Sequence, residues 1–224
     1  MASTEAPMPV GSSLPGPDLW FELPPGFMTF DLTEEPEARA LRMADVADSL
    51  FATATQEQKL RIVASSEYIL QTMIAAGAEH VSSCLLRMPG DVLSQGTFCV
   101  VIESPESGPQ SQDRKGAANR TAAQWRSLFP DAEVGLVMLP YGISALCIRD
   151  LDLEIPGALF GVEDAVHVML RQAQFWVPLR TGPGSALFIF TSEDLEHWDE
   201  YLHVLSSIMK SVSVEEPGEE EASA

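Results

Sequence analysis

The chain has four histidines, the side chains most often used for acid–base chemistry and metal binding. His197 and His203 stand six residues apart on a predicted helix, where two metal ligands need a spacing of three or four. His167 and Arg171 should share one face of a predicted strand, because side chains alternate between faces. They form either a half-buried structural pair or, with Tyr141, the lining of a small pocket. We expect no metal site.

Motifs for other chemistry are missing from the sequence. It contains no GxSxG nucleophile motif and no cysteine within a protease signature. It also lacks the GxxxxGK[ST] and GxGxxG loops that hold phosphates. The sequence therefore predicts no catalytic residue and no cofactor. It favours a non-catalytic protein without deciding whether the chain is an enzyme.

Two clusters of acidic residues are the other candidate sites. Asp150, Asp152 and Glu154 alternate with apolar residues, so three carboxylates should project from one strand face. A calcium loop would need an intervening glycine and flexible polar residues in place of leucines. The second cluster lies at the start and on the exposed side of the last predicted helix. Its members are Glu193, Asp194, Glu196, Asp199 and Glu200.

Both clusters have a structural explanation and a functional one. A solvated outer face explains the strand acids, and the helix dipole favours acids at a helix start. The functional alternative is a docking surface for a basic protein partner, formed by Asp150, Asp152, Glu154, Glu196, Asp199 and Glu200.

The charge balance excludes several classes of partner. The 224 residues include 13 Lys and Arg against 33 Asp and Glu, a formal charge of −20. Residues 19–214 keep 26 of these acids, so most of the acidity belongs to the predicted folded part. Such a surface repels nucleic acid and anionic membranes. No apolar run of about 18 residues occurs, so we expect no membrane insertion.

The cysteines and the N-terminus indicate the compartment. We expect Cys84, Cys99 and Cys147 to be buried, reduced thiols. Cys84 and Cys99 stand on neighbouring predicted strands, so the sequence also allows a disulfide between them. The first 18 residues carry no Lys or Arg and no apolar run of a secretory signal. The sequence predicts a cytoplasmic protein.

Periodicity predicts an α+β domain over residues 19–214 between a disordered arm (1–18) and a disordered acidic tail (215–224). Two short strands come first, then a helical hairpin over residues 36–77, in which Thr55 and Gln58 form a capping box. The predicted elements that follow are strands at 81–86 and 97–102, a polar loop at 103–113, a helix at 116–129, strands at 134–139, 143–155, 166–177 and 185–190, and a last helix of about 20 residues. Hairpin turns are predicted at 140–142 and 182–184, and the last helix should bury Leu195, Trp198, Leu202, Leu205, Met209 and Val212.

The two ends of this domain resemble a known family. The run WFELPPGF at 20–27 resembles the opening strand of the Mog1/PsbP-like fold, and residues 187–212 resemble its last strand and long helix. Uncharacterised actinobacterial proteins share this layout, some of them encoded near type VII secretion genes. The resemblance implies an α/β/α sandwich around a mainly antiparallel sheet and a protein-binding role. The two helices over 36–77 depart from it, since one helix is expected there.

Three functions remain in view. The first is a non-catalytic, cytoplasmic protein-binding factor, accessory or chaperone-like, linked to a secretion system. The second is an enzyme or small-ligand binder with a pocket of scattered residues. The third is a structural homodimer in which an exposed edge strand pairs with its copy.

Overall fold

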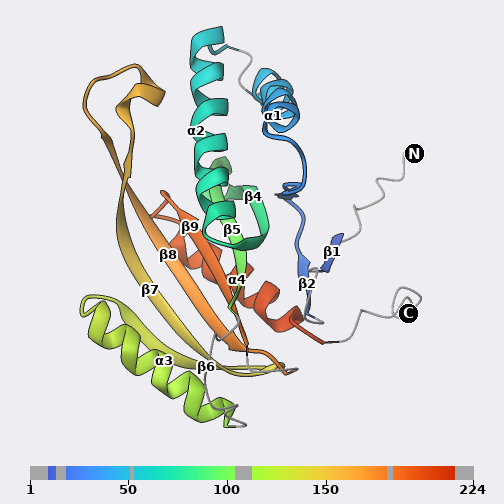
Figure 1. Ribbon diagram of the computed structural model, residues 1–224, viewed down its shortest axis with the longest axis vertical. Coiled ribbons are helices and arrows are strands. Elements are labelled where there is room, and N and C mark those ends of the chain that lie inside the picture. The colour runs from blue at the N-terminus through green and yellow to red at the C-terminus, as the bar shows by residue number, and fades with distance from the viewer. Residues whose placement is uncertain (1–9, 14–18, 51–52, 104–112, 181–183, 215–224) are drawn as a thin grey trace.

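A seven-stranded antiparallel sheet forms the centre of the computed structural model, which describes residues 10–13, 19–50, 53–103, 113–180 and 184–214. In spatial order its strands are β3 (Phe27–Thr29), β4 (Ala78–Met88), β5 (Val92–Glu103), β9 (Ser185–Ser192), β8 (Val166–Pro178), β7 (Gly142–Ile155) and β6 (Glu133–Leu139). Helices lie on both faces (Figure 1). The predicted α+β fold is confirmed: a sandwich with an N-terminal helical hairpin and a C-terminal helix.

The central strand β9 shows why the sheet is covered on both sides. Phe188 and Phe190 are buried in the larger core cluster on one face. Ile189 packs in the smaller cluster on the other face, against residues of β4, β5 and the helical hairpin. An alternating strand with apolar side chains in both directions is stable only between two layers.

Helix α4 (Trp198–Ser211) covers the larger core, where it packs with β2 (Trp20–Leu23). It has 14 residues, so the expected length of about 20 residues was too long. In the chain before it, the carboxylate of Asp194 accepts the backbone N–H of His197 at 3.1 Å. Leu195 is 42% exposed and was wrongly placed in the buried stripe. The buried residues of the helix are Trp198, Tyr201, Leu205, Ile208 and Met209.

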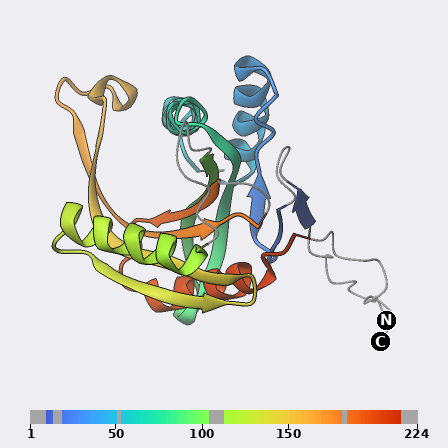
Figure 2. The ribbon, with the colours of Figure 1, turned by 60° about the horizontal axis from the view of Figure 1, so that its bottom comes forward.

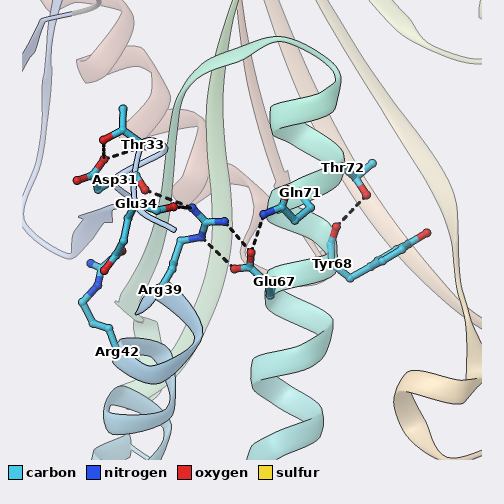
Figure 3. A network of polar contacts seen from close by, with 9 residues as sticks. All are labelled: Asp31, Thr33, Glu34, Arg39, Arg42, Glu67, Tyr68, Gln71 and Thr72. Carbon is cyan, nitrogen blue, oxygen red and sulfur yellow. Dashed lines mark hydrogen bonds and ion pairs between the residues drawn. The ribbon is translucent and has the colours of Figure 1, made fainter. Parts of the chain in front are cut away.

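The other face carries the helical hairpin of α1 (Pro36–Leu50) and α2 (Gln56–Ala75). The capping box is confirmed: the backbone N–H of Gln58 donates to Thr55 Oγ1, and the backbone N–H of Thr55 donates to Gln58 Oε1. Helix α2 packs on β4, and α1 packs on α2. A buried ion pair joins the two helices, because Arg39 donates to both carboxylate oxygens of Glu67 at 3.0 and 2.6 Å (Figure 3).

Helix α3 (Arg114–Leu128) lies over β6, β7 and β8 (Figure 2). Its fully buried Ala118 and Ala122 allow a close approach to the strands. Asp113 begins the helix, and its carboxylate accepts the backbone N–H of Gly116 at 2.8 Å. The helix contains four basic residues, Arg114, Lys115, Arg120 and Arg126, and no acidic residue.

The N-terminal segment differs from the prediction. Strand β2 lies outside the large sheet and pairs antiparallel with β1 (Val10–Ser13). Residues 10–13 therefore form a strand within the arm that we expected to be disordered. The other predicted features at 1–9, 14–18, 104–112, 182–183 and 215–224 lie outside the described residues.

The β7–β8 hairpin extends past its neighbours in the sheet. Strand β6 pairs with β7 only as far as Ile148, and β9 pairs with β8 only from Arg171 onward. Residues 150–170, which we call the ribbon, therefore continue as two strands that end in the short helix η2 (Gly157–Phe160). The ribbon rises beside α2 in Figure 1, and η2 contacts α2. A second short helix, η1 (Pro89–Asp91), forms the β4–β5 turn.

Candidate functional site

The strand acids lie as the alternation predicted. Asp150, Asp152 and Glu154 are exposed, whereas Leu151 and Leu153 between them are half-buried. The three carboxylates project from the ribbon on the α4 side of the sheet, because Asp150 continues the alternation of Leu146 and Ile148, which pack against the larger core.

Arg171 neutralises the first of these acids. It lies directly opposite Asp150 in the β7–β8 ladder, and its guanidinium donates to both carboxylate oxygens at 2.7 and 3.0 Å. These hydrogen bonds from Arg171 hold the pKa of Asp150 below its usual value and raise the pKa of Arg171. His167 Nδ1 lies 3.0 and 3.1 Å from the two carboxylate oxygens of Asp152, a diagonal contact across the same ladder.

The second acidic cluster begins next to this ladder. Glu196, Asp199 and Glu200 are exposed around the start of α4, and Asp199 and Glu200 lie in its first turn. The guanidinium carbon of Arg171 lies 5.9 Å from the ring centroid of Trp198, the first residue of that helix. The base of the ribbon therefore adjoins the first residue of α4, and the two clusters stand on the two segments that come together there. We call Asp150, Asp152, Glu154, Glu196, Asp199 and Glu200 the acidic surface.

Two exposed apolar side chains accompany the acidic surface. Met169 lies opposite Asp152 in the ladder, between His167 and Arg171, and is 53% exposed. Leu195 precedes α4 and is 42% exposed. The helical spacing of Leu195 wrongly indicated a core position, and no sequence pattern gave Met169 a role.

The predicted pocket of Tyr141, His167 and Arg171 is not assembled. His167 and Arg171 share a strand face as expected, but both contact the carboxylates of the ribbon. Tyr141 lies in the β6–β7 turn, nine residues and about 30 Å along the strand from Asp150. Burial raises the pKa of Tyr141, whose hydroxyl accepts the backbone N–H of Arg180 at 3.0 Å. Tyr141 therefore lies at the end of the β7–β8 hairpin away from η2, apart from His167 and Arg171.

A hollow of about 450 Å³ lies where α3 leads into β6. It is lined by Leu128, Phe129, Pro130, Asp131, Ala132, Arg149 and Asp150. The Arg149 guanidinium lies 4.0 Å from the Phe129 ring centroid and donates to Gln172 Oε1. The sequence patterns gave Arg149 no functional role. Its alternation with Cys147 and Leu151 puts it on the α3 face, where a charged residue is unusual.

The three cysteines are buried and free in the structure. Cys84 lies opposite Gly96 in the β4–β5 ladder and Cys99 opposite Val81, and the two thiols belong to core clusters on different faces. The disulfide left open by the sequence is therefore absent, and burial raises the pKa of each of these two thiols to about 12. Over the part of the chain that the structure describes, no three His, Cys, Asp or Glu residues gather as metal ligands.

Comparisons with known proteins return no relative. No family model, no curated protein and no solved structure matches the chain. Within the described residues, no helix is long and apolar enough to cross a membrane.

Proposed function

We propose that the acidic surface binds a basic segment of a protein partner, and that the chain is a non-catalytic binding factor. The observation that carries the proposal is the contact of Arg171 with both Asp150 and Trp198, which joins the ribbon acids to the start of α4. Six carboxylates from two distant segments thereby form one surface, against which Arg171 and, when protonated, His167 supply the nearby positive charge.

Charge gives such a surface selectivity and speed of association. A partner rich in Lys and Arg is attracted by the acidic surface, and acidic competitors are repelled. Exposed ion pairs contribute little affinity by themselves, commonly below about 1 kcal/mol each. The remaining affinity must come from apolar contact.

Met169 and Leu195 supply exposed apolar area on the same two segments that carry the acids. Full burial of an exposed apolar side chain contributes about 1.5–3 kcal/mol, so these two half-exposed side chains contribute about half of that each. Acidic groups around exposed apolar side chains suit a basic amphipathic helix, whose apolar face meets Met169 and Leu195 while its Lys and Arg residues meet the carboxylates.

The enzyme or small-ligand alternative has weaker support, because Tyr141 lies far from His167 and Arg171. The link to type VII secretion stays a prediction from the resemblance, and co-purification from the native host would test it. We propose a cytoplasmic location, where three buried thiols remain reduced.

The test is a binding titration of the full chain with a fluorescein-labelled amphipathic peptide of Leu and Lys, followed by fluorescence anisotropy. The same peptide with Glu in place of Lys serves as the charge control. The variant D152K/E154K/E200K keeps the Asp150–Arg171 pair and reverses three exposed carboxylates. We expect it to bind the basic peptide at least about tenfold more weakly at low salt.

A matched variant makes this result specific to the site. Glu35, Glu37 and Asp45 are exposed acids in or beside α1, so E35K/E37K/D45K changes the net charge equally. Equal weakening by both triple variants would show that net charge alone attracts the peptide and would overturn the proposal. The variant M169S should weaken binding at high salt as well, because its effect is apolar.

A further inference from the structure

The sheet has two edges, which differ in how they are protected. At one edge, β3 has three residues and follows Pro24 and Pro25. Short strands and prolines prevent a further strand from pairing there. At the other edge β6 offers seven residues, with the sequence EVGLVML. Among the described residues no strand pairs with its outer side.

The free backbone groups of β6 can be assigned from its pairing with β7. Leu139 and Gly142 close a two-residue turn, so Leu139, Val137 and Gly135 point their N–H and C=O groups toward β7. Val134, Leu136 and Met138 therefore point theirs outward.

Arg126 supports this assignment. Its guanidinium reaches the carbonyl oxygen of Val134 at 3.1 Å. The outward N–H and C=O groups of Leu136 and Met138 have no strand partner among the described residues. Their side chains are 38% and 77% exposed.

The same free edge continues along the ribbon, and there it carries charge. The even-numbered residues of β7 direct their backbone groups toward the β6 side, so Asp150, Asp152 and Glu154 stand along the edge that β6 no longer covers. Carboxylates at an open edge prevent strand addition. Strand β6 contains no proline, and its single charged residue is Glu133. An uncharged apolar edge of this kind is typical of a strand with a partner.

We propose that β6 pairs antiparallel with β6 of a second copy of this chain, about a two-fold axis at Val137. Leu136 then lies opposite Met138 of the second copy, and each such pair exchanges both backbone hydrogen bonds. These bonds use the free N–H and C=O groups of Leu136 and Met138 on both copies. The side chains that meet are apolar on both sides.

Charge favours this register as well. Glu133 falls opposite Tyr141 of the second copy, so the two Glu133 carboxylates stand about 26 Å apart along the strands. Ile148 is the ladder partner of Glu133, and Asp150 follows Ile148 by two residues. The β6–β7 turn of the second copy, where Arg180 stacks 4.9 Å from the Tyr141 ring centroid, therefore comes next to the acidic start of the ribbon.

The oligomeric state of the full chain tests this inference. Sedimentation equilibrium at physiological salt, from micromolar to several hundred micromolar protein, should show a reversible monomer–dimer equilibrium. The variant L136E/M138E sets like charges opposite each other and should weaken the dimer at least about tenfold.

A charge-swap variant tests the register. In L136E/M138K the introduced glutamate lies opposite the introduced lysine of the second copy, so this variant should restore most of the affinity. With the axis at Leu136 instead, the introduced glutamate would face its own copy and nothing would be restored.

Two further variants separate the interface from the fold. Met138→Pro removes an N–H that points away from β7, so it should abolish the dimer and leave the thermal unfolding midpoint nearly unchanged. Leu41→Glu changes an exposed leucine on α1 and should leave the dimer intact. A chain that stays monomeric at every concentration would overturn the inference. So would a dimer that persists in both L136E/M138E and Met138→Pro.

Discussion

Two arginine–carboxylate pairs of similar geometry occupy very different surroundings. Arg39 and Glu67 join α1 to α2, and their side chains are 1% and 17% exposed. Arg171 and Asp150 join the strands at the base of the ribbon, with exposed fractions of 32% and 45%. Both arginines donate to both oxygens of one carboxylate. The two pairs differ in their exposure to solvent, and this exposure determines what each pair does.

The buried pair is part of a closed network. Arg39 also donates to the backbone carbonyl of Glu34 at 2.8 Å, and Gln71 donates to Glu67 at 2.8 Å (Figure 3). The hydrogen bonds from Arg39 lower the pKa of Glu67. A charge removed from water must be satisfied by such partners, so this pair fixes how the helices dock. The exposed pair leaves its neighbouring carboxylates accessible to a partner.

The largest expected effect comes from breaking the buried pair. Arg39→Met leaves Glu67 partly buried and without its cation, and should lower the free energy of unfolding by about 3–5 kcal/mol. Denaturation by urea, monitored by circular dichroism, measures this change. The control is Arg42→Met, an arginine that is 46% exposed and pairs with Glu34, and it should cost under about 1 kcal/mol.

A double variant sharpens this prediction. If the loss in Arg39→Met reflects an uncompensated carboxylate, then R39M/E67M should regain much of the stability, because apolar residues can replace a buried pair. A double variant less stable than the single one would contradict this explanation.

His80 extends the comparison to a buried base that has no counter-ion among the described residues. It is 5% exposed between the Phe21 and Phe98 rings, and burial lowers its pKa from 6.5 to about 4. Because the pKa is lower in the folded state, the stability from neutral His80 is complete above pH 6.5 and is lost as the pH falls toward 4.

Acidification should therefore destabilise the protein through His80. The expected loss between pH 7 and pH 5 is about 2 kcal/mol, at about 1.4 kcal/mol per pH unit below about 6.5. The variant His80→Leu should reduce this pH dependence, whereas His203→Gln, at an exposed position, should not. Equal pH dependence in wild type and His80→Leu would show that other groups cause the loss.

The smallest effect is expected at the exposed pair. Arg171→Gln should change the free energy of unfolding by under about 1 kcal/mol, because solvent already screens both charges. It should strengthen binding of the basic peptide, since Asp150 then loses its cation. A loss above about 2 kcal/mol would show that this pair is structural, and the contrast with Arg39 would fail.

Local features of the fold could be predicted because their causes are local. Alternation along the ribbon and the Thr55–Gln58 capping box depend on residues that are neighbours in the sequence. The start of α4 was wrong for the same reason: the spacing of Leu195 continues the helical stripe, but Asp194 accepts the His197 N–H and the helix begins only at Trp198. Tyr201, which the predicted stripe omits, is fully buried with its hydroxyl 2.6 Å from that of Ser94, 107 residues earlier in the chain.

The candidate site shows the same division between features with local causes and features with long-range causes. The sequence by itself determined which residues are acidic, which strand face they share, and that most of the negative charge lies between residues 19 and 214. Only the tertiary structure decided that the ribbon acids and the start of α4 adjoin through Arg171, that Tyr141 lies elsewhere, and that β6 is an open edge among the described strands. These are long-range relations between strands, and strand order follows from how the whole sheet and its helices exclude water, which no short segment encodes.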